Sequence, residues 1–469
     1  ELLENRIPDI EKKKLRGRFG KLLNKNLSGN YINFSTAFQH VGIRSMLAVV
    51  ANKYFSNPFR SYSPNTDFNR DPYYMGYFAL GMHNFGVVMW LKEELQKKNN
   101  RCVHFVARDG YAVKQVYDVL REKYSEMPES NYFYMSRKSL LPLAITSKES
   151  FYALNRYMTL KECTLQFLLM LLHPVLKLFD NIEKFFFEKG FFMNKPLQEN
   201  EIELVLKIIA NDLFDEERMK NYRNEMKEYF SKQIRPGDAM FDIGYSGRAQ
   251  ALLSNLLGYH IDAYYIHSIN DDIGLYKLEG DFSVKTFFDY TPSVVGRMRE
   301  LIQMEPAGSC IGYHRSEDGI EPIFEQSRLS YLAKMVIDMM HKGAKDFATD
   351  MVNVFSDDLQ FLEWRYMDSV CVHEMFLSAP LQGDMSVFRV FYFEDDMFYG
   401  QNYSKQDIVA LWEKDLRKKN LLPDIQTGGK IEPKMDVIVP EMKSIKATEL
   451  QIPKSSIPIT SDKIDLVHI

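Results

Sequence analysis

A strand, a glycine-rich turn and a helix follow one another between positions 238 and 258, and this succession constrains the fold more than any other stretch of the chain. The apolar run 239–241 predicts a short buried strand that ends on Asp242. After the turn, apolar side chains recur at helical spacing from Ala249 to Leu257, and Gly258 is a typical helix stop. A strand that leads through a tight turn into a helix is the building unit of α/β proteins.

The turn itself has the composition of an anion-binding site. Its backbone N–H groups and the positive end of the following helix would converge on one point, which suits a phosphate group. The carboxylate of Asp242 lies beside that point. Asp and Gly also occur in such turns for turn geometry alone, and this remains the alternative. The turn residues that we predict to bind phosphate or diphosphate are Gly244, Tyr245, Ser246, Gly247 and Arg248.

The same succession occurs earlier in the chain. Residues 102–107 predict a buried strand, Arg108–Asp109–Gly110 a turn, and 113–120 a helix. Further strands are predicted at 132–135 and 262–266. This alternation predicts an α/β fold with a mostly parallel sheet, in which ligands bind outside the carboxyl ends of the strands. We therefore expect one edge of the sheet to gather Arg108, Asp109, Arg137, Lys138, Asp242, Ser246 and Arg248.

Four regions are predicted along the 469 residues. They are a helical N-terminal region with an aromatic loop (1–100), an α/β core (101–315) with a large helical insertion (140–235), a mainly helical C-terminal region (316–420) with a strand-like run at 387–393, and an extended tail or linker (421–469). The aromatic loop is either a solvated loop or a lid that binds the acceptor. Its candidate acceptor-binding residues are Asp67, Asn69, Arg70 and Tyr73.

Composition excludes several classes of protein. Hydrophobic residues make up 45% of the chain, which is enough for a sizeable core. The net charge is −4, so the chain as a whole lacks the excess of positive charge that is typical of nucleic-acid-binding proteins. The four cysteines are widely spaced, form no disulfide or zinc pattern, and fit the reducing cytoplasm. No signal peptide is visible, and the apolar run 165–179 is too short to span a membrane, so we predict a buried or surface-lying helix pair there. Because the chain begins with Glu1 rather than Met, we expect a fragment of a longer protein.

The motifs of several enzyme classes are absent. A phosphatase of the paired-acid type needs a second acid two residues after the first, whereas Asp109 is followed by Gly110 and Tyr111, and Asp242 by Ile243 and Gly244. The sequence contains no nucleotide-binding phosphate loop, no dinucleotide-binding glycine motif and no His-Glu-x-x-His zinc motif. The candidate functional groups that remain are basic side chains together with isolated carboxylates. They would hold phosphate groups, accept ribose hydroxyls, ligate Mg²⁺ or act as a general base.

Four segments resemble a family of bacterial polysaccharide biosynthesis: FVARDGY (105–111), YFYMSRK (132–138), FDIGYSG (241–247) and NPF…DFNRDPYYMGY (57–77). In that family such a region is the glycan phosphoribosyltransferase part of dual-domain ribofuranosyltransferases, and it follows a haloacid-dehalogenase-like phosphatase. The resemblance implies transfer of 5-phosphoribose from phosphoribosyl diphosphate to a lipid-linked or growing glycan, such as O-antigen or capsule. It also implies a location in the cytoplasm or at the inner face of the membrane. The phosphatase would be a fused or separate partner, because its paired-acid motif is missing from this sequence.

The implied reaction is a single displacement at the anomeric carbon, with inversion and an oxocarbenium-like transition state. We expect Asp109, Asp242 and Glu305 to be the catalytic carboxylates and Mg²⁺ to accompany the donor. Arg108, Arg137, Lys138 and Arg248 are expected to bind its phosphates. Asp242 as a turn-capping acid and Asp109 as a structural partner of Arg108 remain alternatives. Two other functions stay open: a glycosyltransferase that uses a nucleotide sugar, and a non-catalytic domain that binds the glycan acceptor.

Overall fold

The computed structural model describes residues 41–54, 65–157, 160, 163–245, 247–268, 284–289, 292, 296–327, 329–362, 364, 366–393, 406–419 and 421. Ser246 and all but one residue of the predicted tail 421–469 lie outside the described residues. Among the helices that the structure describes, none is both long and apolar enough to cross a bilayer.

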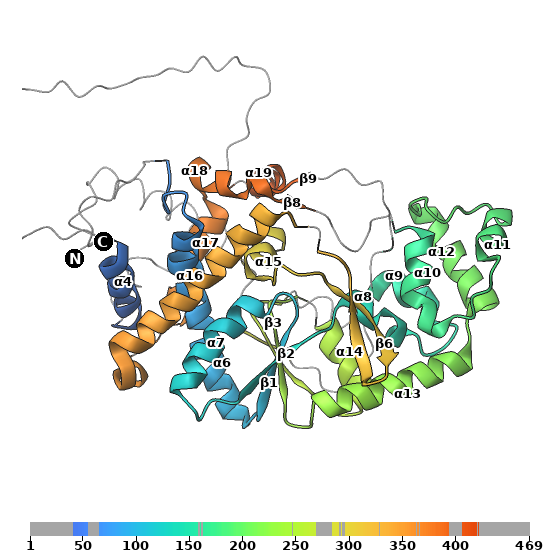
Figure 1. The fold of residues 1–469 in the computed structure, drawn as a ribbon, viewed down its shortest axis with the longest axis horizontal. Helices are drawn as coiled ribbons and strands as arrows, with labels where there is room; N and C mark the ends of the chain where they lie inside the picture. Colours follow the sequence, from blue (N-terminus) through green and yellow to red (C-terminus); the bar gives the residue numbers. More distant parts are fainter. Residues whose placement is uncertain are drawn as a thin grey trace, which may run out of the picture. The chain divides into compact units, whose positions relative to one another are not determined.

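Five strands form one sheet in which every neighbouring pair is parallel, so the predicted α/β fold is confirmed (Figure 1). The order across the sheet is β2 (Glu129–Phe133), β1 (Cys102–Val106), β3 (Ala239–Asp242), β4 (Asp262–Tyr265) and β5 (Val284–Thr286). All five residues of β1 are buried. This agrees with its nearly continuous apolar sequence, because a central parallel strand is covered on both faces.

The chain winds in opposite directions from the two central strands. From β1 it passes through α7 (Tyr111–Lys123) to β2, and from β3 through α14 (Arg248–Leu257) to β4. The helices cover opposite faces, since α7 shares a core with Phe105 and Phe241, whereas α14 shares a core with Met240. The loops after β1 and β3 therefore diverge at a topological switch point, which is where open α/β sheets bind their ligands.

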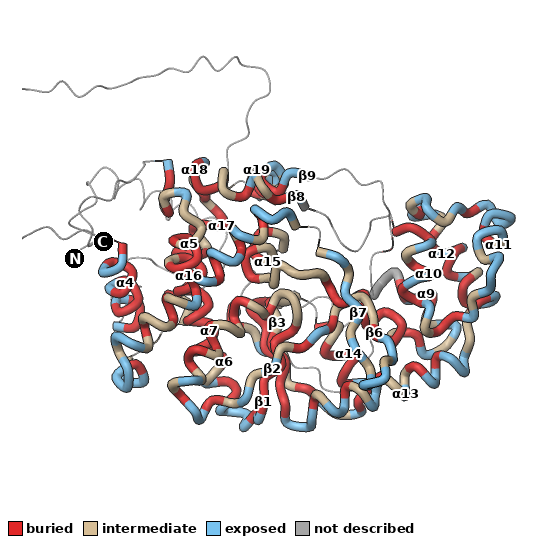
Figure 2. The backbone as a smooth tube through the Cα atoms, in the orientation of Figure 1, coloured by how far each residue is buried: buried red, intermediate tan, exposed pale blue. Residues whose placement is uncertain are grey.

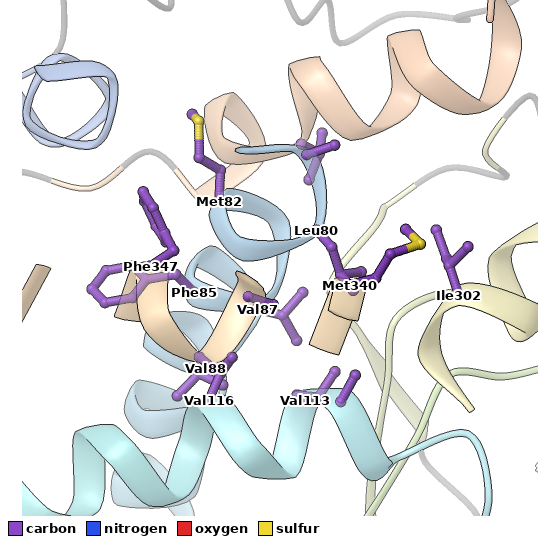
Figure 3. Close-up of a cluster of buried hydrophobic side chains, with 14 of the residues drawn as sticks. Leu80, Met82, Phe85, Val87, Val88, Val113, Val116, Ile302, Met340 and Phe347 are labelled. Atoms are coloured by element: carbon purple, nitrogen blue, oxygen red, sulfur yellow. The ribbon is translucent and has the colours of Figure 1, made fainter. Parts of the chain in front are cut away.

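The core on the α7 face joins segments that are far apart in the sequence. It contains α6 (Gly81–Lys98), α7 and α16 (Tyr331–Phe355), and Figure 3 shows Val88, Val116 and Phe347 of these three helices in one cluster. The described parts of the predicted N-terminal, central and C-terminal regions thus share one core. The other helices that contribute to it are α4 (Val41–Tyr54), α5 (Pro72–Met75), α15 (Arg297–Gln303), α17 (Cys371–Ser378), α18 (Gln382–Met385) and α19 (Ile408–Lys418).

The crossing of α16 over the π-helical turn Gly76–Leu80 depends on two glycines. A Cβ atom on Gly76 would overlap the carbonyl of Met340, and one on Gly343 would overlap the carbonyl of Tyr73. Only a residue without a side chain allows the two backbones to approach this closely. These glycines fix α16 against the N-terminal helices and hence against the strand ends.

The helical insertion packs on the opposite face of the sheet, between β2 and β3 in the chain. It comprises α8 (Arg137–Leu140), α9 (Ser150–Tyr157), α10 (Leu165–Leu172), α11 (Ile182–Glu188), α12 (Glu199–Ile208) and α13 (Glu216–Gln233). Its leucine, phenylalanine and methionine side chains form a second core with α14, and Figure 2 shows exposed residues mainly on its outer helices. The predicted helix pair at 165–179 is instead α10 followed by one 3₁₀ turn, His173–Val175.

Two local predictions differ from the structure. The run 387–393 is mostly a 3₁₀ helix, Ser386–Val390, and only Tyr392–Phe393 (β8) pairs as a strand, with Gln406–Asp407 (β9). A short apolar run does not by itself distinguish a strand from a buried helical turn. The antiparallel hairpin of β6 (Cys310–Ser316) and β7 (Gly319–Phe324) was not predicted. All four cysteines are buried thiols.

Candidate active site at the carboxyl ends of the strands

Asp109 and Asp242 meet at the switch point of the sheet. Strands β1 and β3 are paired with Phe105 opposite Phe241, so the chain leaves both strands at the same edge. Both residues are half-buried there: Asp242 is the last residue of β3, and Asp109 lies in the turn between β1 and α7. The structure therefore brings together the two acids that the sequence analysis placed at one edge.

The two acids have unusual ionisation. Burial, followed by the charge of Glu300, raises the pKa of Asp109 to about 7, against the opposing charges of Arg108 and Arg137. Burial and then the charge of Asp109 hold the pKa of Asp242 well above its ordinary value, although the N–H of Ile243 donates a hydrogen bond of 2.7 Å to its carboxylate. Carboxyl groups with such raised pKa values are typical of functional sites, because a bound cation or a proton relieves their repulsion.

Glu300 is a third acid of this site, and the sequence analysis did not select it. It lies on α15, above the strand ends in Figure 1, and its carboxylate accepts a hydrogen bond of 2.6 Å from the hydroxyl of Tyr245. Its charge raises the pKa of both Asp109 and Asp242. The sequence contains only a weak signal for this role, namely a polar residue between the buried positions Met298 and Ile302 of a short helix.

Glu305 holds the β1 loop in place. Its carboxylate accepts a hydrogen bond of 2.9 Å from the hydroxyl of Tyr132, and its N–H donates to the carbonyl of Arg108 at 3.0 Å. The guanidinium of Arg108 in turn donates to the carbonyl of Ala307 at 3.0 Å. These contacts give Glu305 a positioning role beside the acids, whereas its predicted catalytic role stays a prediction.

The backbone of the turn after β3 is shaped by two glycines, and its predicted binding of phosphate stays a prediction. Gly247 has a φ of 69° and is the N-cap of α14, so the helix begins directly at the turn with Arg248 as its first residue. Gly244 has a φ of 153°, and a Cβ atom there would lie 2.7 Å from the carbonyl oxygen of His267. Both glycines are thus required by the backbone. Tyr245 is oriented by its hydrogen bond to Glu300.

Arg137 and Lys138 are adjacent in sequence but have different surroundings. Arg137 is exposed at the start of α8, and its charge acts on Asp109. The side chain of Lys138 is only 3% exposed, and its ammonium lies 3.1 Å from both carboxylate oxygens of Glu325 on the segment after β7. The structure thus brings Arg137 to the acids, while the charge of Lys138 is balanced within the protein.

The predicted acceptor-binding loop is organised around a buried acid. Asp384, which is fully buried, accepts hydrogen bonds from the N–H groups of Asp67 at 2.6 Å and Arg70 at 3.3 Å. The N–H of Asn69 donates to Thr66, and the hydroxyl of Tyr73 donates to Asp346 at 2.8 Å. These contacts give the loop a structural role, and its acceptor-binding role stays a prediction.

An aromatic surface next to the acids was missed by the sequence analysis. It consists of Tyr111, Tyr132, Tyr134 and Phe324, which we call the aromatic strip. Its neighbouring ring centroids are 5.6, 5.2 and 4.9 Å apart. Tyr111 begins α7 and Tyr132 lies on β2, whereas Tyr134 and Phe324 are 37% and 45% exposed. The strip therefore leads from the acids to the protein surface at the β6–β7 hairpin.

Neither the models of known protein families nor the curated proteins compared with this sequence match it.

Proposed function

We propose that this protein is a glycan phosphoribosyltransferase, which moves 5-phosphoribofuranose from phosphoribosyl diphosphate to a glycan hydroxyl with inversion. One observation carries the proposal: Asp109 and Asp242 meet at the switch point, between two arginine-bearing loops and a glycine turn that opens a helix. The resemblance of four sequence segments to this family supports the same activity. The donor carries a phosphate, a diphosphate and ribose hydroxyls, and these are the groups that such a site binds.

The phosphates of the donor match the basic and glycine-rich parts of the site. The N-terminus of α14, which opens at Gly247, offers backbone N–H groups to one phosphate, and Arg248 adds a positive charge. Arg108 and Arg137, whose charges act on Asp109, face the diphosphate from the other side. The planar guanidinium of arginine can donate two parallel charge-assisted hydrogen bonds to the oxygens of one phosphate group.

The acids fit Mg²⁺, which prefers oxygen ligands and is usually bound by one or two carboxylates together with substrate phosphates. Asp242, with Glu300 beside it, would hold the ion. When bound, Mg²⁺ neutralises the diphosphate and makes it a better leaving group. The electrostatic repulsion among the three acids is the physical reason for a cation here.

In the transfer step the acceptor oxygen forms a bond to the anomeric carbon, and the diphosphate leaves with the electron pair of the broken bond. Asp109 accepts the proton of the acceptor hydroxyl. Its burial beside Glu300 makes it a stronger proton acceptor than an exposed aspartate. A single displacement of this kind inverts the configuration at the anomeric carbon.

The aromatic strip provides the surface for the acceptor. Exposed aromatic rings present flat apolar area at little cost in conformational entropy, and sugar rings stack on them through their C–H faces. Tyr134 and Phe324 are exposed, whereas Tyr132 contacts Glu305 beside the β1 loop. A glycan stacked on the two exposed rings would extend toward Asp109.

Replacing Tyr134 with alanine is expected to raise the KM for the glycan acceptor about fivefold, because about 1 kcal/mol of stacking energy is lost. The dissociation constant of phosphoribosyl diphosphate should not change. Initial rates at varied acceptor concentration, with calorimetry for the donor, measure both quantities. Phe187→Ala, which removes a 60% exposed ring of α11, is the matched control and should leave the KM unchanged. An equal effect of both substitutions would contradict the role of the strip.

The proposed function is tested by calorimetric titration of phosphoribosyl diphosphate with Mg²⁺ into the parent protein and an Asp242→Asn variant. We expect the parent to bind and the variant to bind at least about tenfold more weakly, because it lacks a carboxylate of the cation site. Asp118→Asn is the control, since Asp118 is a half-buried acid of α7 that pairs with Lys114. If neither the parent protein nor the variant binds phosphoribosyl diphosphate, the assignment is wrong. Titration with nucleotide sugars and with the glycan would then separate the two alternative functions.

A further inference from the structure

A second cluster of buried ionisable side chains lies outside the proposed donor site. It contains His83 of α6 and His373 and Glu374 of α17. Both imidazoles are fully buried, and their ring centroids are 4.1 Å apart. One potential ligand atom of each of the three residues lies within 4.8 Å of the other two. Ligand atoms about 2 Å from a common metal ion are about 3–4 Å apart, so small side-chain movements would complete such a site.

The ring of His83 is oriented by its neighbours. Asn84 donates an amide hydrogen bond of 3.0 Å to Gln303 and accepts one of 2.8 Å from it. The oxygen of the Asn84 amide lies 2.9 Å from Nδ1 of His83. This pair therefore orients the ring of His83 through Nδ1.

His373 faces Glu374. Its Nδ1 lies 3.1 Å from a carboxylate oxygen of Glu374, which is close to the separation of two ligand atoms around one ion. Within the described part of the chain, Nε2 of neither His83 nor His373 has a hydrogen-bond partner. Buried polar atoms without a hydrogen-bond partner are costly unless something binds them.

A third imidazole lies close to these two. His267 follows β4, is fully buried, and has no hydrogen-bond partner on either ring nitrogen among the described residues. Its pKa is lowered to about 3 by burial first and then by the charges of Arg299 and His83, which places it within electrostatic range of the cluster. His267 is thus a further buried imidazole near the cluster, whereas the potential ligand atoms that lie within 4.8 Å of one another belong to His83, His373 and Glu374.

The charge balance of the cluster selects the type of ion. The guanidinium of Arg299, which is fully buried, donates to both oxygens of Glu374 at 2.7 and 2.9 Å. A carboxylate has about four lone-pair sites, so it can bind a guanidinium and a metal ion at the same time. Because Arg299 already neutralises this carboxylate, an ion here depends on imidazole nitrogen more than on negative charge. That preference is typical of Zn²⁺, Co²⁺ or Fe²⁺ and not of Mg²⁺ or Ca²⁺.

We propose that His83, His373 and Glu374 bind a divalent transition-metal ion. The ion joins α6 to α17, and so links the N-terminal helices to the C-terminal helices. This site is separate from the Mg²⁺ site at Asp242 and does not depend on the transferase function. Asn84 and Gln303 are positioning residues that orient the ring of His83.

The test begins with metal analysis of the parent protein purified from cells grown with added Zn²⁺. We expect about one equivalent of zinc per chain, and about one equivalent of Zn²⁺ or Co²⁺ taken up again after removal with a chelator. X-ray absorption at the zinc edge should show imidazole nitrogen around the ion, at about 2.0 Å. A parent protein that holds no transition metal as purified and takes up neither ion overturns the proposal.

Substitutions locate the ion. His83→Gln and His373→Gln should each lose the bound zinc, whereas Asn84→Leu should weaken its binding about 10–100-fold through the orientation of His83. The control is His341→Gln, which removes a buried imidazole of α16 whose Nε2 bonds to the carbonyl of Ile302. It should retain the metal. Circular dichroism checks that each variant is folded. Unchanged zinc content in the folded His83 and His373 variants would place the ion elsewhere and overturn the assignment.

Discussion

Asp109→Asn should reduce kcat for phosphoribosyl transfer about 10²–10⁴-fold, because the variant cannot accept the proton of the acceptor hydroxyl. The substitution preserves the size of the side chain, so binding of the donor should change much less than kcat. Initial rates with phosphoribosyl diphosphate, Mg²⁺ and a glycan acceptor measure this effect. Asp118→Asn on the neighbouring helix should retain full activity. An Asp109→Asn variant with parental kcat would remove Asp109 from the mechanism.

The same substitution should make the protein more stable in the absence of divalent cations. In the native state the pKa of Asp109 is raised from 3.8 to about 7 by burial and Glu300, against Arg108 and Arg137. Between pH 4 and pH 7 the unfolded state has lost this proton and the native state still holds it, so the parent loses stability as pH rises through this range. Asparagine does not ionise and avoids this loss.

We therefore expect the free energy of unfolding of Asp109→Asn to exceed that of the parent by on the order of 4 kcal/mol at pH 8, with the difference disappearing near pH 4. Urea unfolding in EDTA at both pH values measures it. Added Mg²⁺ should stabilise the parent more than the variant, because an ion at Asp242 and Glu300 relieves the repulsion among the three acids. A variant that is less stable than the parent at pH 8 would show that Asp109 is a structural acid, such as a partner of Arg108.

The second large effect is expected at the buried ion pair of α15. Arg299→Met should destabilise the protein by about 3–5 kcal/mol, because the carboxylate of Glu374 then lacks its guanidinium partner in a position that is only 16% exposed. Urea unfolding at pH 7 in the presence of a chelator measures this change without a contribution from bound metal. Arg297→Met is the control on the same helix. It removes an ion pair with Asp415 whose partners are 40% and 38% exposed, so it should cost at most about 1 kcal/mol.

A double variant separates charge from packing. Combining Arg299→Met with Glu374→Gln removes both charges, so most of the stability lost in Arg299→Met should return. If the double variant is as unstable as the sum of the two single variants, the guanidinium contributes through packing against Phe288, whose ring centroid lies 5.4 Å from it, and not through the ion pair.

The two strand–turn–helix units could be predicted from the sequence because their signals are local. The apolar run 239–241, the helical spacing of 249–257 and the glycine at 258 correspond to β3, α14 and a left-handed C-cap with a φ of 82°. Alternation of such units implied a parallel sheet, and the carboxyl ends of parallel strands share one edge. Asp109 and Asp242 could therefore be assigned to that edge before any tertiary structure was known.

Other parts of the candidate site depend on contacts between distant segments. Lys138 is paired with Glu325, which lies 187 residues further along the chain. Glu300 acts on the two aspartates because α15 lies across the strand ends, and no periodicity in the sequence predicts this placement. The rings of Tyr134 and Phe324 meet through a hairpin that the sequence analysis did not identify.

The sequence by itself determined the class of fold, the position of the acids at the strand ends and the glycine turn before α14, because backbone geometry and periodicity act over a few residues. Only the tertiary structure decided the strand order that places β1 beside β3, the partners of Glu300 and Lys138, and the cluster of His83, His373 and Glu374. These features arise when helices bury their apolar faces against a common sheet. The burial of apolar surface has no preferred direction, and it brings together residues that are far apart in the sequence. The pairs of polar groups that meet in this way are therefore not encoded in any local pattern.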